Sequence, residues 1–514
     1  MKTLFKTVAL VSVFSVSEKF LGFLYRIFLS RTIGAEGVGL YQVALSVFGL
    51  FYTVACSGIP VTVSRLMTKY RAENKPIKSQ RVITAGFFVT TLTALPITVL
   101  FFVFKSNFSF LFTDERCVNV FSVIIPGLTF TCIYSVLRGV FWGDKNFMPY
   151  SIIELLEEAV MIISGIILIH FAESPYSGAM RAGVAVFISY IFSFSTATVY
   201  FFIKKNKLKN PRTELKPLLK SAMPVTAMRT ANTLTVSLVS VILPMRLVLA
   251  GYTNSQAMSA FGSVIGQAFP LLSVPTMAIS AFTLVMMPEI SEHYYKKDHI
   301  ALKNAVEKAL KITIIISVLA IPVFSVLGEE IGILVFDNHE SGMYLSVSAF
   351  LILFIGISSV TTSILNSMGL ENKTLVYYVI SGILMLISIW ILPKFLGIYS
   401  LLIGFTFVFG LTSLFNLILL SKSCKEKPKY LKFTFLSVLG VIPSIILSFM
   451  LKSLLLPLLG ILLSCITVSV ISTGFSVAFL FGLGVTEYRS VKNVISSIFK
   501  RKKSLKSETL KSRV

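Results

Sequence analysis

Residues 38–104 read VGLYQVALSVFGLFYTVACSGIPVTVSRLMTKYRAENKPIKSQRVITAGFFVTTLTALPITVLFFVF. Two apolar runs, 38–66 and 81–104, flank a short segment rich in Lys and Arg. A helix rises about 1.5 Å per residue, so each run is long enough to cross the ~30 Å hydrocarbon core of a bilayer. The stretch therefore predicts two membrane-spanning helices joined by a basic loop.

The same pattern recurs along the chain and predicts fourteen membrane-spanning helices. Hydrophobic residues make up 55% of the 514 residues and charged residues only 14%, too few to cover a soluble domain. We therefore expect an all-α polytopic membrane protein. The expected spans lie near residues 7–30, 38–66, 81–104, 117–140, 150–170, 181–203, 219–249, 257–290, 304–326, 342–366, 375–392, 396–420, 430–451 and 457–483.

Basic residues are distributed unequally between the two sides of the predicted membrane. Side one holds the N-terminus, every second loop and the C-terminal tail, and with the adjoining span ends it carries thirty-five of the 47 Lys and Arg residues. Basic loops stay in the cytoplasm, so both termini are expected there, in the cytoplasmic membrane. The net charge of +24 is expected to face anionic lipids and not nucleic acid. Apart from Arg31, at the outer end of the first span, side two carries five basic residues: Lys105, Arg116, Arg181, Lys394 and Lys452.

The chain also repeats itself. The first six spans recur about 212 to 225 residues later in the next six. Because six is even, both halves enter from the same side, which predicts a parallel repeat. We expect two pseudo-symmetric six-helix lobes, 1–203 and 217–421, around a central cavity. A pair of spans (430–483) and a basic cytoplasmic tail (484–514) fall outside the repeat. The loops are too short for a folded catalytic domain, which favours transport and not an enzyme.

Several charges lie inside the apolar spans, where each is costly and therefore needs a reason. Lys19 and Arg229 lie about twelve residues into spans one and seven, roughly 18 Å deep, too far for the side chain to reach a surface easily. Arg26 and Arg246 lie nearer the outer side. We expect these four cations to line a polar cavity and bind an anionic, phosphate-bearing cargo, because guanidinium groups bind phosphate oxygens in pairs.

Span five carries an acidic stripe, Glu154, Glu157 and Glu158, at helical spacing. Adjacent carboxylates repel in a low dielectric unless cations pair with them, and Arg65 and Arg138 lie at a similar depth. Three roles stay open: an ion-pair lattice between spans, a gate that opens when substrate phosphate competes for the arginines, and coupling to protons or Na⁺. The five cysteines show no metal or redox spacing, and no cofactor is expected.

Two segments resemble a known family. They are EKFLGFLYRIFLSRTIGAEGVGLYQ at 18–42 and LPMRLVLAGYTNSQAMSAFGSVIGQAFPLLSVP at 243–275. Both are similar to stage V sporulation protein B-like members of the multidrug/oligosaccharidyl-lipid/polysaccharide exporter superfamily, and the likeness runs over roughly residues 15–420. The chain departs from the family pattern in span five, where Glu154 and Glu158 replace amides and Met161 stands where an arginine is common. Lys19 likewise stands where relatives often carry arginine.

The resemblance implies a fourteen-span, two-lobed flippase that works by alternating access. Its relatives move undecaprenyl-pyrophosphate-linked sugars, including peptidoglycan precursors, across the cytoplasmic membrane. The resemblance further implies a role in spore cortex or cell envelope formation, and we expect the protein to function as a monomer.

Two alternatives belong to other functional classes. A cation-coupled multidrug exporter of the same superfamily would need acidic groups deep in the cavity, whereas the mid-depth charges here are basic. A membrane-embedded glycosyltransferase would need a catalytic acid or base on an outer loop. The outer acidic cluster fits solvated loop charge better, and it comprises Glu329, Glu330, Asp337, His339 and Glu340.

Overall fold

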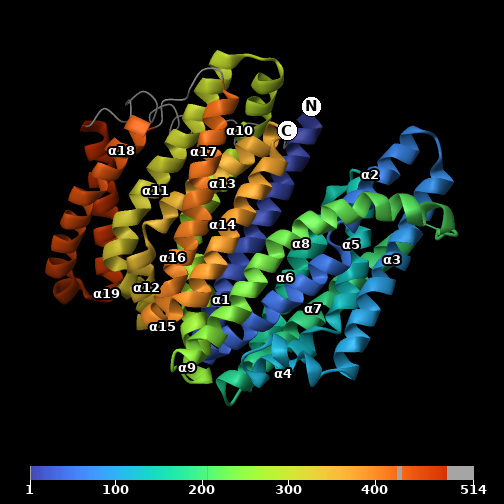
Figure 1. The fold of residues 1–514 in the computed structure, drawn as a ribbon, viewed down its shortest axis with the longest axis horizontal. Helices are drawn as coiled ribbons and strands as arrows, with labels where there is room; N and C mark the ends of the chain where they lie inside the picture. The colour runs from blue at the N-terminus through green and yellow to red at the C-terminus, as the bar shows by residue number, and fades with distance from the viewer. Residues whose placement is uncertain (1, 205–206, 425–430, 483–514) are drawn as a thin grey trace, which may run out of the picture. The chain divides into compact units, whose positions relative to one another are not determined.

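The computed structural model describes residues 2–204, 207–424 and 431–482 (Figure 1). Throughout these ranges every regular element is a helix, and no strand occurs in them. Of the described helices, nine are long and apolar enough to cross a membrane, or eleven if each of two bent helix pairs counts as one span. The expected all-α membrane fold is confirmed.

The chain divides into two compact units. Unit 1 comprises Met1–Leu271, Val335–Ser341 and Tyr378–Val408. Its helices lie mainly in the first half of the chain, and the long α8 packs against α1, α2 and α3. They are α1 (Lys2–Cys56), α2 (Ile59–Ala72), α3 (Pro76–Val103), η1 (Asn107–Leu111), α4 (Glu115–Ile124), α5 (Gly127–Gly143), α6 (Phe147–Ile169), α7 (Pro175–Ile203), α8 (Arg212–Leu249), α9 (Asn254–Phe261), η2 (Gly262–Ala268), α15 (Pro393–Leu396), η3 (Gly397–Tyr399) and α16 (Ser400–Phe405).

Unit 2 comprises Leu272–Leu334, Gly342–Tyr377 and Phe409–Val514. Apolar side chains of α10, α11, α13 and α17 form its core, with Ile290, Val306 and Ile364 fully buried. Several helices begin in one unit and end in the other. The helices that lie wholly or partly in unit 2 are α10 (Phe269–Tyr295), α11 (His299–Phe336), α12 (His339–Ser348), α13 (Leu351–Ser367), α14 (Glu371–Ile391), η4 (Thr406–Leu411), α17 (Thr412–Ser423), α18 (Leu431–Leu439) and α19 (Val441–Gly482).

Two helices contain a glycine break that explains how the expected spans map onto them. Gly34 in α1 has φ 68° and Gly460 in α19 has φ 71°, a conformation that a residue with a Cβ rarely adopts. Each of these helices therefore contains two helical segments, and α1 covers the first expected span and the start of the second. The fifth expected span, α6, is not among the nine because it carries three glutamates. The expected count of fourteen is consistent with this arrangement.

The expected division into lobes at 1–203 and 217–421 stays a prediction. The expected pair of spans at 430–483 corresponds to α18 and α19 within the described residues. In unit 2, Lys452 of α19 pairs with the buried Glu330 of α11 at 2.6 Å and also donates to the Val326 carbonyl at 3.0 Å. The predicted tail at 484–514 lies outside the described residues.

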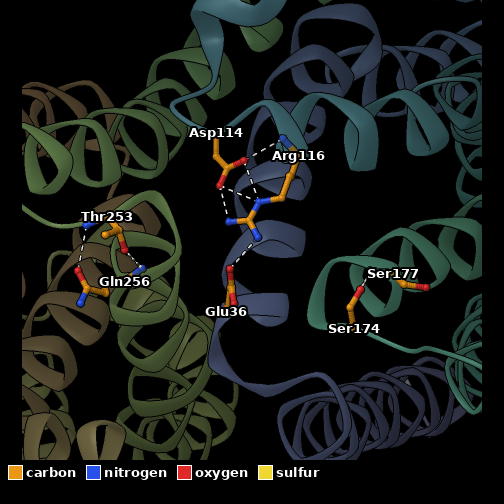
Figure 2. A network of polar contacts seen from close by, with 7 residues as sticks. All are labelled: Glu36, Asp114, Arg116, Ser174, Ser177, Thr253 and Gln256. Carbon is orange, nitrogen blue, oxygen red and sulfur yellow. Dashed lines mark hydrogen bonds and ion pairs between the residues drawn. The ribbon is translucent and has the colours of Figure 1, made fainter.

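Three helices of unit 1 begin with side-chain caps near the α1 break (Figure 2). Asp114 accepts from the backbone N–H of Arg116 at the start of α4, and Ser174 accepts from Ser177 at the start of α7. Thr253 and Gln256 form a reciprocal capping box on α9. The first N–H groups of a helix have no partner within it, so each cap fixes where its helix begins.

Within unit 1, α1 packs tightly against α9 and η2 through small residues. A Cβ at Gly39 would overlap the carbonyl oxygen of Met258, and a Cβ at Gly262 would overlap that of Ala35. Backbones in an apolar bundle approach this closely only where side chains are absent. The crossing therefore fixes the position of η2 against α1.

We expect Gly39→Ala and Gly262→Ala each to lower the free energy of unfolding by about 1–3 kcal/mol, because the added methyl group must displace backbone. The measurement is the apparent unfolding midpoint in detergent. Gly49→Ala is the matched control, since no atom lies within 4 Å of a Cβ at this position of the same helix. Equal midpoints for Gly39→Ala, Gly262→Ala and Gly49→Ala would show that the crossing is not close-packed.

Candidate functional site

The three glutamates of the acidic stripe lie on α6 and face different neighbouring helices. Glu154 accepts a hydrogen bond from Arg138 of α5 at 3.2 Å, and Arg138 also donates to the Tyr52 hydroxyl of α1 at 3.0 Å. The Arg138 guanidinium lies 5.5 Å from the centre of the Trp142 ring. One member of the stripe is therefore held in an ion pair that joins α1, α5 and α6, with both side chains about one-fifth exposed.

The other two glutamates face different helices. Glu157 lies within hydrogen-bonding reach of Ser193 on α7. Glu158 lies against α1, where a Cβ added to Gly22 would be 2.9 Å from its Oε1. Half-buried Glu18 of α1 repels Glu154 and Glu158, so four carboxylates share this part of unit 1 with the guanidinium groups of Arg26 and Arg138. The four carboxylates thus outnumber the nearby cations, which are Lys19, Arg26 and Arg138, by one.

Of the two cations expected on span one, Lys19 is exposed and Arg26 is half-buried. Arg26 Nη1 is 3.5 Å from the carbonyl oxygen of Ile265, in the π-helical turn η2. A π-helical turn alters the helical hydrogen-bond pattern and often marks a functional position. Arg26 thus joins α1 to η2.

Arg229 of α8 reaches the break between α1 and α2. Its Nη1 donates to the carbonyl of Ser57 at 2.8 Å, while the Arg229 side chain as a whole is exposed. Arg65, about two turns beyond the break on α2, donates to the Ser221 hydroxyl of α8. Arg65 therefore bonds to α8, whereas Arg138 alone of the two pairs with the α6 stripe.

Arg246 lies at the far end of α8, with its guanidinium 4.8 Å from the centre of the Trp390 ring. Seventeen residues separate Arg229 from Arg246, about 25 Å along the helix. A single phosphate could not contact both. The structure thus gives the predicted cations different partners at different levels of unit 1, and their common role in binding a substrate stays a prediction.

A buried network that the sequence did not single out joins η2 to α1 and to the segment before α12. Gln267 donates to the Ser30 hydroxyl at 2.6 Å, and Asn338 donates to Gln267 at 2.7 Å and to Ser263 at 2.9 Å. Gln267, Ser30 and Ser263 are each at most 3% exposed. An amide or hydroxyl side chain within an apolar run indicates a buried polar group. The sequence does not show which groups it bonds, because these partners lie far away along the chain.

A second group that the sequence did not single out lies near the α1 break (Figure 2). Arg116 donates to Glu36 at 2.7 Å and to Asp114 at 2.7 Å. This ion triad ties the start of α4 to the residues just after Gly34. Arg116, like Lys452 in unit 2, is thus a basic residue of side two with a structural partner.

The outer acidic cluster does not form a single site. Glu330 is buried in the pair with Lys452, and Asn338 caps the start of α12 by accepting from the backbone of Glu340. Among the described residues, no group of three or more His, Cys, Asp or Glu side chains could hold a metal ion.

These features define a multi-pass, all-helical membrane protein with charged side chains inside its bundle. The chain belongs to the family described as polysaccharide biosynthesis protein, which matches residues 4–294. Stage V sporulation protein B of Bacillus subtilis (strain 168) is 25% identical over 446 residues, covering 83% of this chain and 86% of the relative. The resemblance to the exporter superfamily is confirmed.

Solved structures show the same fold. The lipid II flippase MurJ in an inward closed conformation has a TM-score of 0.69 at 16% identity, covering 92% of this chain and 99% of that one. An inward-facing multidrug resistance MATE family transporter of the same superfamily has a TM-score of 0.66 at 15% identity, covering 79% and 95%. At these identities the likeness establishes the fold alone.

We expect Arg138→Met and Glu154→Met each to destabilise the protein by about 1–3 kcal/mol, because each leaves a partly buried charge without its partner. The double variant should lose less than the sum of the two, as apparent unfolding midpoints in detergent would measure. The exposed Lys69–Glu73 pair is the control, and its loss should change stability by less than about 1 kcal/mol. Strict additivity of the Arg138 and Glu154 effects would exclude a coupled pair.

Proposed function

We propose that this protein is a flippase that translocates an undecaprenyl-pyrophosphate-linked oligosaccharide or peptidoglycan precursor across the cytoplasmic membrane. One observation carries the proposal: Lys19 and Arg229 are exposed, although the apolar pattern predicts that both lie deep in membrane spans. A charge facing lipid at the centre of a span costs at least about 2.5–3.5 kcal/mol. A water-filled chamber that receives an anionic head group accounts for both exposed cations.

The chemistry of the cations favours a diphosphate. Guanidinium groups form strong charge-assisted bonds to phosphate oxygens, and the low dielectric of the protein around the chamber strengthens them. One similar protein is named a lipid II flippase, which supports this substrate class, and another is named a sporulation protein, which supports a role in sporulation. We therefore place the protein in cell envelope or spore cortex synthesis. It would act as a monomer, by alternating access between two six-helix lobes around the chamber.

The carboxylates of α6 support a role in energy coupling. Glu18 of α1 and Glu154, Glu157 and Glu158 of α6 outnumber the three cations near them, Lys19, Arg26 and Arg138, so a proton or Na⁺ would relieve their repulsion. The ion pair of Arg138 with Glu154 fits the structural and gating roles equally. Loss of transport in the stable double variant Arg138→Met/Glu154→Met would favour gating, and normal transport would favour a structural lattice.

A cation-coupled multidrug exporter is the second candidate. It is supported by the likeness to the MATE transporter fold and by the same excess of acid near α6. Such an exporter carries a cationic cargo, whereas the proposed flippase carries an anionic one. Strong resistance to cationic dyes in cells, without any effect on lipid-linked wall precursors, would favour the exporter.

We expect Lys19→Ala and Arg229→Ala to abolish translocation of a pyrophosphate-linked lipid sugar in reconstituted vesicles, because each removes a cation from the path of the head group. Transport would be followed by the accessibility of the sugar to an external enzyme. Lys394→Ala removes an exposed cation of side two outside the proposed chamber and should transport normally. Normal transport by both Lys19→Ala and Arg229→Ala would refute the site assignment.

We expect both termini on the cytoplasmic side, because the loops on side one carry most of the basic residues. A reporter that is active only in the cytoplasm should be active when fused to either terminus. The same reporter inserted in the side-two loop at 105–114 should be inactive. Activity from the loop insertion alone would reverse the proposed orientation.

A further inference from the structure

The second expected span is broken in its middle. Helix α1 ends at Cys56 and α2 begins at Ile59, so Ser57 and Gly58 lie outside both helices. Pro60 follows at the start of α2 and has no N–H to donate to the carbonyl four residues earlier. Helix ends leave backbone groups without partners, and in an apolar bundle such groups must find partners elsewhere.

Two side chains of α8 form hydrogen bonds with the backbone at the break, one with Gly58 and one with Ser57. Thr226 Oγ1 accepts from the backbone N–H of Gly58 at 3.1 Å, and Arg229 Nη1 donates to the carbonyl of Ser57 at 2.8 Å. The two helices nearly touch here, because a Cβ at Gly58 would overlap the Ala222 carbonyl. Residues 226 and 229 are one turn apart and thus share a face of α8.

The two hydrogen bonds differ in how easily an incoming anion could compete for their side chains. Thr226 is half-buried, whereas Arg229 is exposed and has further N–H groups beyond the one that bonds Ser57. A guanidinium bonds a phosphate oxygen more strongly than a neutral carbonyl, because both partners are charged. An anion that reaches Arg229 would therefore compete with the Ser57 carbonyl for it.

We propose that Arg229 and Thr226 cap the break in the second span, and that a diphosphate bound at Arg229 withdraws the guanidinium from Ser57 and loosens the break. Arg229 is then a positioning residue for the second span as well as a ligand for the anion. This inference rests on the proposed function for the identity of the anion. The cap itself rests only on the two hydrogen bonds and the close approach at Gly58.

Linkage between the two events works in both directions. If the anion weakens the cap, then a weaker cap must strengthen anion binding by the same factor. Thr226→Val removes the neutral bond and leaves Arg229 in place, so this variant should bind the anion more tightly. A purely structural role for Thr226 would not predict that gain.

The thiol of Cys56 can be used to measure local opening at the break. Cys56 is the last residue of α1, its Sγ donates to the Tyr52 carbonyl at 3.4 Å, and it is 0% exposed. Its reaction with a maleimide therefore requires local opening. The experiment uses the full chain with the other four cysteines replaced by alanine, as the parent protein, after its unfolding midpoint has been matched to the natural sequence.

Arg229→Gln should raise the labelling rate of Cys56 about tenfold without any ligand, as expected for the loss of a hydrogen bond from a charged donor. Arg229→Lys keeps a charged donor and should fall between Arg229→Gln and the parent. Arg246→Gln removes the same charge from the same helix at the Trp390 contact and should label like the parent. Parent-like labelling of a folded Arg229→Gln would overturn the proposed cap.

Inorganic pyrophosphate, compared with sulfate at equal ionic strength, is the anion probe. It should speed the labelling of Cys56 in the parent and, at lower concentration, in Thr226→Val, but not in Arg229→Gln. No effect on the parent, or an equal effect on Arg229→Gln, would overturn the coupling. Failure of lipid transport in vesicles with these labelling results intact would overturn the flippase and leave the cap standing.

Discussion

A backbone group or charge without a partner is costly inside an apolar bundle, and the break in the second span shows how one helix supplies partners for another. The chain interrupts the helix at Ser57 and Gly58, and α8 supplies both an acceptor and a donor from one face. In an apolar medium an unsatisfied amide costs several kcal/mol. The packing of α8 along α1 and α2 is therefore tied to this short interruption.

The same requirement explains where the other polar groups lie. Gln267, Asn338 and Ser30 satisfy one another in a closed network, and Arg138 satisfies Glu154 and Tyr52. A satisfied network is rigid, and it can rearrange only if another partner replaces the one it loses. Arg229 differs from these groups because it is bonded and also exposed, so an arriving anion can reach it without first breaking into a buried cluster.

Much of the fold could be predicted from the sequence, because the length of an apolar run and the charge of a loop are local properties of the chain. The spans follow from apolar runs, and Gly34 and Gly460 bend α1 and α19 where the expected spans meet. Arg138 and Glu154, sixteen residues apart, could be proposed as partners from depth alone. The partners of Ser57 and Gln267 could not, because Thr226, Arg229 and Asn338 are brought to them by packing between distant helices.

The expectation that four cations line one cavity rests on their depth in the predicted spans. Depth does not determine the direction in which a side chain points. Arg26 contacts η2, Arg246 contacts Trp390 and Arg229 donates to the Ser57 carbonyl, so protein groups already contact three of the four cations. Lys19 and Arg229 keep exposed charge deep in apolar helices, which costs stability unless function requires it. A binding site confined to these two cations would not include Arg246, which lies about 25 Å further along α8.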